Sequence, residues 1–443
     1  MNNWKQISIG EFVDFNPSES IPKGKLVKKI PMAKLTEFVR KINGYEYAEY
    51  NSGPKFRNFD TLVAKITPCL ENGKTAFVDI LEENEIAFGS SEFIVLRENK
   101  NSTSEFVYYL AKSPVFRERA INCMEGTSGR KRVNEGALKR QEIIVPDKPT
   151  QQKIAKVLSD LDAKIELNNK INSALEAMAK TLYDYWFVQF DFPDSNGKPY
   201  KSSGGKMVWN AELKSEIPKG WEVKSLSYIC EIINGYAFKS EWYTDSGVKI
   251  IRTKNFENGY VDLNDLVFLD NEFAKQFDKY QLKTYDFLMV MVGASTGKHC
   301  TVNSNILPAL QNQNMWRFIS KIENQQLFLN LKLERIVLEL ENTTNGSARG
   351  FFQKDSFLSK IVEVPNQDLI ENFCNKINSV FKRIDNNLKE NQELASLRDW
   401  LLPMLMNGQV TVASTSSATE KGYEVEDSEL GMVAEDKVEC KKN

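Results

Sequence analysis

The stretch GWEVKSLSYICEIINGYAF, residues 220–238, repeats the pattern with which the chain opens, NNWKQISIGEFVDFNP at residues 2–17. Each segment places a Trp before a Lys, continues with alternating aliphatic residues, and then reaches an acidic residue, an aromatic residue and a turn former. Self-similarity at a fixed offset is the sequence signature of a repeated structural unit. The chain is therefore predicted to contain the same domain twice.

The repeat extends over most of the chain at an offset of 217 to 219 residues. Trp4 aligns with Trp221, TSGRKRVN (127–134) with GSARGFFQ (346–353), and IIVP (143–146) with VEVP (362–365). Between these points, short aliphatic and aromatic runs are broken by Gly, Pro and Asn, which is typical of β-strands joined by turns. Each half is predicted to be a strand-rich mixed α+β domain.

A long helix is predicted after each domain, because the segments from Thr150 and from Asp368 lack Pro and Gly for more than 30 residues. Apolar residues recur there every seven positions, as in a coiled coil, and each helix has an Asn in its middle layer. If the helices pack antiparallel, a pseudo-two-fold axis would bring Asn168 and Asn387 together and fix the register; alternatively, each points to water. The core positions are Ile154, Leu161, Asn168, Leu175 and Leu182, with Val157, Ile171 and Met178 beside them, and Phe373, Val380, Asn387, Leu394 and Leu401, with Ile377, Ile384, Leu397 and Met404 beside them.

These patterns divide the chain into six parts. The first domain covers residues 1–147 and its helix 148–187, and a connector rich in Gly, Ser, Lys and Pro covers 188–216. The second domain covers 217–366 and its helix 367–407. The remaining tail, 408–443, is polar and acidic and is expected to be disordered.

Composition restricts the class of protein. A length of 443 residues favours more than one domain, and 41% hydrophobic, 27% charged and 11% aromatic residues are typical of globular proteins. No run of about 18 apolar residues occurs and the N-terminus lacks a signal-peptide pattern, so no membrane contact and a cytoplasmic location are expected.

The net charge of −2 argues weakly against nucleic-acid binding. However, residues 411–443 hold eight acidic and four basic residues, so the preceding 410 residues carry −2 + 4 = +2. The body of the protein is thus near neutral, and local clusters of basic residues must decide. The clusters are KGKLVKK (23–29), RER (117–119), GRKR (129–132) and LKR (138–140).

Motifs for catalysis are missing from the sequence. GASTGKHC (293–300) resembles a phosphate-binding loop but has one residue too few between its glycines, and His299 stands where Ser or Thr should bind magnesium. PCLENGKT (68–75) lacks the first glycine. No glycine-rich turn for S-adenosylmethionine and no nuclease carboxylate pair stands out. The six cysteines are scattered, so no metal site and no catalytic residue is predicted.

Five segments together resemble the specificity (S) subunit of type I restriction-modification systems. They span about residues 1 to 412, and their ordered repetition is far more specific than any one of them. The segments are ITPCLENGKTAF (66–77), VPDKPTQQKIAKVLSDLDAKIELNNKINSALE (145–176), YDYWFVQFDFP (183–193), IPKGWEVKSL (217–226) and LPMLMNGQVTV (402–412).

The resemblance implies a DNA-reading adaptor without catalytic activity. Two target-recognition domains, each followed by a conserved spacer helix, would read the two halves of a bipartite asymmetric site in double-stranded DNA. The helices would pack antiparallel and hold the two readers apart. Two methyltransferase (M) subunits, which modify an adenine in each half-site, and, for restriction, two restriction (R) subunits would be the partners. S-adenosylmethionine and ATP would be bound only by those partners, and this chain would need no cofactor.

Candidate DNA contacts are chosen by residue type and position, since Arg, Lys, Asn, Gln, Ser and Thr read bases or hold phosphates from loops. In the first half they are Lys65, Thr67, Lys74, Ser90, Ser91, Arg130, Lys131 and Arg132. In the second half they are Arg252, Lys254, Ser295, Thr296, Lys298, Gln311, Asn312, Gln313 and Arg349.

Other readings stay open. One is a coiled-coil adaptor whose two β-rich domains bind protein or glycan and do not contact DNA. Another is an enzyme that uses His299 or a cysteine. Apolar residues at the helix ends could hold the methyltransferases, although packing against the chain's own domains is the interpretation we favour. They are Tyr183, Tyr185, Trp186, Phe187, Trp400 and Leu401.

Overall fold

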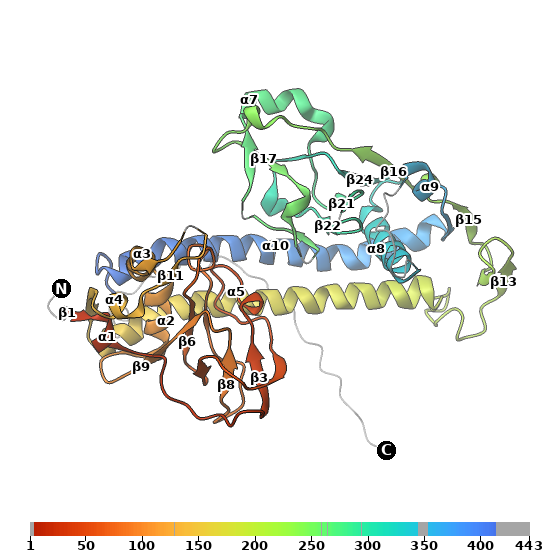
Figure 1. The fold of residues 1–443 in the computed structure, drawn as a ribbon. Coiled ribbons are helices and arrows are strands. Elements are labelled where there is room, and N and C mark those ends of the chain that lie inside the picture. The colour runs from red at the N-terminus through yellow and green to blue at the C-terminus, as the bar shows by residue number, and fades with distance from the viewer. Residues whose placement is uncertain are drawn as a thin grey trace, which may run out of the picture. The chain divides into compact units, whose positions relative to one another are not determined.

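The two ends of each sequence repeat pair with one another and close a domain. In the computed structural model (Figure 1), β1 (Trp4–Ser8) pairs antiparallel with β12 (Glu142–Pro146), and β15 (Glu222–Ser225) pairs with β25 (Ile361–Val364) in the same way. The structure describes residues 4–127, 129–257, 259–263, 265–293, 295–343 and 353–412. Within this range the chain forms two units: the first comprises residues up to Ser159 and from Trp400 onward, and the second comprises Asp160–Asp399.

The first unit contains two four-stranded sheets. One has the order β2-β9-β6-β7, with β2 (Val13–Phe15), β9 (Phe93–Glu98), β6 (Thr61–Ala64) and β7 (Thr75–Phe77). The other has the order β4-β3-β8-β5, with β4 (Glu46–Glu49), β3 (Leu26–Ile30), β8 (Ala87–Gly89) and β5 (Lys55–Phe56). The remaining elements are α1 (Ile9–Phe12), α2 (Ser104–Lys112), α3 (Pro114–Asn122), the pair β10 (Met124–Glu125) and β11 (Arg132–Val133), and α4 (Glu135–Lys139).

The core of the first unit is completed by residues from the other end of the chain. Leu402, Leu405 and Met406 are buried in the same cluster as Ile9 and Phe12. Gly408, which has a φ of +73°, lies so close to the indole of Trp4 that a Cβ would be 3.2 Å from the ring. The first domain is therefore built from both ends of the chain.

The second unit repeats this topology, except that its second sheet has three strands in the described residues. One sheet has the order β16-β24-β21-β22, with β16 (Cys230–Asn234), β24 (Met315–Ser320), β21 (Phe287–Val290) and β22 (His299–Thr301). The other has the order β20-β17-β23, with β20 (Val267–Leu269), β17 (Val248–Ile251) and β23 (Ala309–Gln311). The remaining elements are α6 (Leu226–Ile229), β18 (Phe256–Glu257), β19 (Tyr260–Val261), α7 (Asn271–Ala274), α8 (Gln326–Thr343) and α9 (Lys354–Leu358).

The segment predicted to be a connector is folded. It forms the hairpin β13 (Met207–Asn210) and β14 (Ser215–Pro218). The ring of Phe192 stacks on Tyr200 and on Trp221, with centroids 4.7 Å and 5.6 Å apart. Its Gly and Ser residues thus form turns around an aromatic cluster.

The two long helices, α5 (Lys148–Tyr183) and α10 (Gln367–Met406), lie side by side and antiparallel in the second unit (Figure 1). Asn172 accepts a hydrogen bond from Asn387 (2.7 Å), and Asp162 accepts one from Arg398 (2.6 Å). The partner on α10 thus moves eleven residues forward in sequence when the residue on α5 moves ten residues back, as antiparallel helices require. The fold predicted from the sequence, two strand-rich domains with an antiparallel helix pair, is confirmed.

The detailed packing of the helices differs from the heptad prediction. Asn168 and Asn387 are both buried, but they do not bond to one another: Asn168 donates to Glu390 (2.7 Å) and Asn391 (2.9 Å). Met178 and Leu397 were placed in the stripe, yet 52% and 44% of their surfaces are exposed. In the first helix the second buried stripe lies one residue further along than predicted, at Leu158, Asn172 and Ala179. In the second helix the predicted Ile377 and Ile384 are buried, and Arg398 is buried in place of Leu397.

The two helices contact the strand-rich domain of the second unit as well as each other, which is a physical reason for this difference. Ala179 lies in one cluster with Tyr260, and Ile377 in another with Leu327 and Phe328, so part of each helix surface packs against the strand-rich domain of the second unit. The buried face is consequently wider than the narrow stripe of an isolated coiled coil.

Candidate nucleic-acid interface

Three loops meet at one edge of the first unit. The amide of Lys65 donates to the carbonyl of Glu92 (2.8 Å), and the amide of Thr67 donates to the carbonyl of Lys131 (3.0 Å). Residues 65–67, 90–92 and 130–132, which we name the first loop edge, are therefore adjacent although they are far apart in sequence. The structure brings together here Lys65, Thr67, Ser90, Ser91, Arg130, Lys131 and Arg132.

Charges at the first loop edge fall into two groups. Arg132 binds Glu92 through two nitrogens, at 2.8 Å and 2.7 Å, and this contact holds the pKa of the Glu92 carboxyl below its usual range. The ammonium of Lys65 lies 3.4 Å from Glu135. Arg130 and Lys131 are exposed. The last two side chains are thus the most accessible cations for a phosphate backbone.

Lys74 is separated from this group by its side-chain direction. Its carbonyl accepts the amide of Ala64 (3.0 Å), but its ammonium is directed to the carbonyl of Met32, 3.5 Å away. The prediction placed it around the same loop, and the structure puts its ammonium against the backbone instead.

The second unit builds the corresponding edge with the same hydrogen bonds. The amide of Met291 donates to the carbonyl of Asn314 (3.2 Å), and that of Asn312 to the carbonyl of Ile251 (3.2 Å). These bonds correspond to Lys65 with Glu92 and to Ser90 with Ile30 in the first unit. We name residues 252–255, 291–293, 295–298 and 312–314 the second loop edge. Among the predicted contacts it includes Arg252, Lys254, Ser295, Thr296, Lys298, Asn312 and Gln313.

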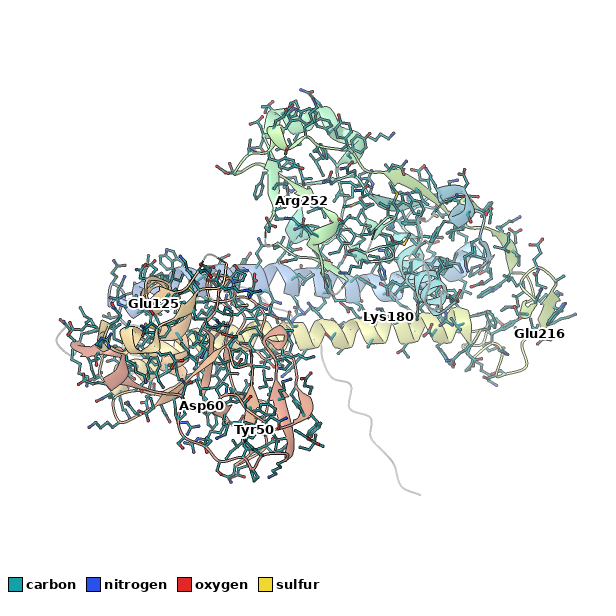
Figure 2. All side chains as sticks on the ribbon, in the orientation of Figure 1. Tyr50, Asp60, Glu125, Lys180, Glu216 and Arg252 are labelled. Carbon is teal, nitrogen blue, oxygen red and sulfur yellow. The ribbon has the colours of Figure 1, made fainter. Side chains whose placement is uncertain are left out.

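Arg252, labelled in Figure 2, and Lys254 share one carboxylate, that of Asp265. The bond from Lys254 and the charge of Arg252 hold the pKa of Asp265 below its ordinary value. Thr296 donates its hydroxyl to the carbonyl of Gly293 (2.6 Å) and so stabilises the turn after β21, while Lys298 in that turn is exposed. The second edge therefore presents different charges on a similar backbone.

Two predicted contacts do not belong to this surface. Gln311 is fully buried, and its amide donates to the carbonyls of Ile233 (3.1 Å) and Met315 (3.0 Å). It cannot reach a ligand from that position, so its assignment as a DNA contact is corrected. Arg349 lies outside the described residues.

The polar layer between the helices contains a residue that the sequence reading missed. Asn172 is 4% exposed and accepts a hydrogen bond from Asn387. It lies four residues after Asn168, and a pattern that allowed spacings of both three and four would have identified it.

The helix-end aromatics pack mainly inside the protein. Tyr183, Trp186 and Phe187 are buried in one cluster with Trp221 and Phe328 of the second unit. This agrees with the interpretation that they pack against the chain's own domain. Tyr185 and Trp400 remain accessible, with exposed fractions of 36% and 56%.

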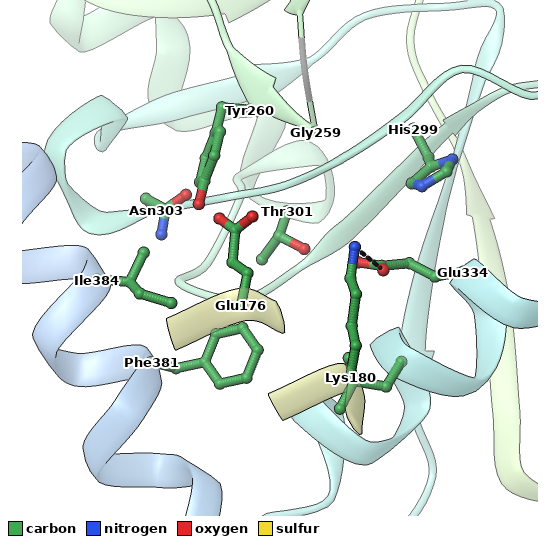
Figure 3. A pocket seen from close by; sticks show the side chains of 11 residues that line it. Glu176, Lys180, Gly259, Tyr260, His299, Thr301, Asn303, Glu334, Phe381 and Ile384 are labelled. Carbon is green, nitrogen blue, oxygen red and sulfur yellow. Dashed lines mark ion pairs between the residues drawn. The ribbon is translucent and has the colours of Figure 1, made fainter. Parts of the chain in front are cut away.

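The only histidine of the chain, His299, lines a cavity of about 220 Å³ in the second unit (Figure 3). Lys180 forms an ion pair with Glu334 (2.9 Å) at its wall, and burial raises the pKa of the nearby Glu176 carboxyl. His299 bonds the carbonyl of Gly297 (3.0 Å) and stacks on Phe287. The cavity is lined by Glu176, Lys180, Gly259, Tyr260, His299, Thr301, Asn303, Leu331, Glu334, Phe381 and Ile384.

Two buried cysteines, Cys230 and Cys374, do not offer an activated nucleophile. Burial raises the pKa of Cys230 to about 12 and that of Cys374 to about 11, so these thiols stay protonated near neutral pH. In the part of the chain that the structure describes, no group of three or more His, Cys, Asp or Glu side chains could hold a metal ion. That same part contains no helix with the length and hydropathy needed to cross a bilayer.

The fold and the two loop edges define a class of duplicated protein in which each of two similar domains presents a polar loop edge and is followed by a long helix. The family model described as "Type I restriction modification DNA specificity domain" matches residues 1–177 and 218–398, once for each repeat. The chain therefore belongs to the family of type I restriction-modification specificity subunits.

Individual relatives agree with this family. The MjaIX specificity subunit of Methanocaldococcus jannaschii is 30% identical over 315 residues, which are 70% of this chain and 69% of that protein. The HindI specificity subunit of Haemophilus influenzae is 27% identical, and the similarity covers 93% of this chain and 100% of that protein. The crystal structure of a type I S subunit from M. genitalium has the same fold, with a TM-score of 0.52 at 16% identity over 91% of this chain and 96% of that one.

Proposed function

We propose that this chain is the DNA sequence-recognition subunit of a type I restriction-modification complex. Its two strand-rich domains read the two halves of a bipartite asymmetric site in double-stranded DNA. The observation that carries the proposal is the pair of loop edges: both are held by corresponding backbone hydrogen bonds, yet they present different polar side chains. A shared frame with different surface residues is what two readers of two different half-sites require.

The chain acts in this proposal without catalysis of its own. Two methyltransferase subunits, and two restriction subunits where restriction occurs, carry the chemistry and bind S-adenosylmethionine and ATP. Near-neutral charge fits this division, since the partners can supply much of the phosphate attraction that a basic protein would provide itself.

Genome-wide mapping of methylated adenines in strains with and without the gene tests the proposal. The expected result is one bipartite motif, with an adenine modified in each half, that disappears with the gene. Identical methylation in both strains would contradict it. Replacing His299 by Ala should leave the motif and its degree of methylation unchanged, because the chain contributes recognition rather than a catalytic base.

The alternative adaptor without DNA contact predicts a different outcome. A gel-shift assay with the complex of this chain and its methyltransferase would then show no sequence preference among genomic fragments. The recognition proposal instead expects fragments that contain the mapped motif to be retained at salt concentrations that release the others.

A further inference from the structure

Gln311 joins both sides of a loop at the second edge. Its side chain has no exposed surface, and its Nε2 donates to the carbonyl of Ile233 in β16 and to that of Met315 at the start of β24. Residues 312–314, the part of the second loop edge that follows Gln311, therefore begin and end at points that are tied to a single buried amide.

The backbone of Gly235 lies directly against the backbone of Asn312. A Cβ built on Gly235 would lie 1.8 Å from the carbonyl oxygen of Asn312, so only glycine fits there. The backbone amide of Tyr236 donates to the carbonyl of Gln311 (3.2 Å), and the ring of Tyr236 packs against Phe238 and Phe277. One flank of loop 312–314 is thus held by a rigid aromatic segment.

The first unit has no such amide at the equivalent position. In the parallel strand pair of each unit, Ile30 is the partner of Gly89 as Ile251 is the partner of Gln311. The next residue then donates to the same strand in both units: Ser90 to Ile30, and Asn312 to Ile251. Gln311 therefore occupies the place of Gly89, and the side-chain clamp belongs to the second reader alone.

We propose that Gln311 is a positioning residue that fixes loop 312–314 in the shape that reads the second half-site. This rests on the proposed DNA-recognition function. A loop whose shape is fixed before binding loses less conformational entropy when it binds DNA, and it accepts fewer alternative base contacts. Gln311 would therefore increase sequence selectivity although it does not touch DNA. Without the amide, the carbonyls of Ile233 and Met315 lose their side-chain donor and the loop can adopt other shapes.

The experiment compares Gln311→Met with a matched control. Methionine keeps the length of the side chain and removes the donor. Gln151 is also fully buried and donates from Nε2 to two carbonyls, those of Asn101 (3.0 Å) and Pro146 (2.9 Å), but it lies in the first unit and outside both loop edges. Gln151→Met therefore removes the same kind of double donor away from the proposed reading surface, together with the acceptor of the Thr103 amide (3.0 Å).

Each variant is expressed with the methyltransferase partner, and adenine methylation is mapped genome-wide. For Gln311→Met, discrimination against single-base changes should fall roughly tenfold in one half-site, the factor that a single base pair commonly provides. The other half-site should keep its consensus, and Gln151→Met should leave both unchanged. Gln311→Asn, whose shorter amide cannot span both carbonyls, should have a smaller effect in the same half-site, and it replaces Gln311→Met if that variant does not fold.

Three results would overturn the role of Gln311. The first is an unchanged consensus in folded Gln311→Met, and the second is an equal loss of discrimination by Gln311→Met in both half-sites. The third is a loss of discrimination in Gln151→Met as large as that in Gln311→Met. The absence of any bipartite motif with the unaltered chain would instead contradict DNA recognition itself, so the two failures can be told apart.

Discussion

Arg130 and Lys131 illustrate how a single loop can provide affinity without deciding sequence. Both side chains are exposed at the first loop edge, while the neighbouring Arg132 is bound to Glu92. Replacing Arg130 and Lys131 by Ala should weaken binding of the methyltransferase complex to all DNA fragments alike. Each lost phosphate contact reduces the slope of log affinity against log salt by about 0.9, so the slope should fall by roughly 2.

Salt titrations by fluorescence anisotropy measure this slope. Lys100 and Lys153 are exposed in the first unit but lie away from the loop edge, and their double replacement by Ala is the control. The placement of Arg130 and Lys131 on the DNA would be wrong if both double variants changed the slope equally.

Glu176 makes a separate prediction about pH. Burial raises the pKa of this carboxyl, the charge of Lys180 opposes the shift and that of Glu334 adds to it. The folded state then binds the proton of Glu176 more tightly than the unfolded chain does. The contribution of this proton to the stability of the fold is complete below the ordinary pKa of 4.5, and it is lost as the pH rises through the pKa of Glu176 in the folded state. Glu176→Gln should raise the thermal midpoint at neutral pH and give no gain below pH 4.5.

Thermal unfolding followed across that pH range tests this. Glu393→Gln, at an exposed position of α10, removes the same charge without relieving burial and should show no comparable gain at neutral pH. A destabilised Glu176→Gln at neutral pH would show instead that attraction to Lys180 outweighs the cost of burial.

Residue types in loops predicted the general location of the candidate site but not the fate of each side chain. Lys65 and Thr67 were proposed from one sequence segment and Ser90 from another, and the structure brings the two segments to one edge. The pairing of Arg132 with Glu92 and the burial of Gln311 depend on contacts between segments distant in sequence. No local pattern reports such contacts, and for this reason Gln311 was assigned to the surface.

At the scale of elements, the polar layer between α5 and α10 sets the register of the helix pair. Asn387 donates to Asn172, and both are almost fully buried. Asn387→Leu should cost about 1–3 kcal/mol, because it leaves the amide of Asn172 buried without this partner. Replacing both residues by Leu should restore stability to the level of the original chain or above it, since an apolar pair has no unmet hydrogen bond.

Chemical denaturation of Asn387→Leu, Asn172→Leu and the double variant gives the coupling energy between the two residues, which we expect to be at least about 1 kcal/mol. Asn386→Leu, on the exposed side of the same helix turn, is the control. Equal effects of Asn386→Leu and Asn387→Leu would show that the layer does not contribute to stability.

The helices themselves were predictable because the absence of Pro and Gly over a long periodic segment is a local signal. Their exact contact faces were not. Val157 and Ile171 are only half-buried, whereas Leu158 is buried in the core of the first unit and Asn172 is buried against Asn387. A seven-residue period describes only the contact of one helix with another.

At the scale of the whole molecule, duplication was visible in the sequence, since Trp4 and Trp221 open similar domains. The closure of the first domain by the far end of the chain was not visible, because it joins segments with no shared pattern. Leu402, Leu405 and Met406 form the end of α10, a helix that belongs mostly to the second unit, yet they are buried in the core of the first.

This closure predicts that shortening the chain acts on the domain at its opposite end. A chain ending at Asp399 loses the buried side chains of Leu402, Leu405 and Met406, each worth about 1.5–3 kcal/mol, or roughly 5–9 kcal/mol in total. That is comparable with the whole stability of a typical domain. Limited proteolysis with mass spectrometry should find cleavage throughout the described residues up to 159, while the described residues between 160 and 399 keep the protection that they have in the full chain. A chain ending at Val412 keeps the three residues and should resist like the full chain. Equal resistance of the chain ending at Asp399 would show that the first domain folds without its C-terminal segment.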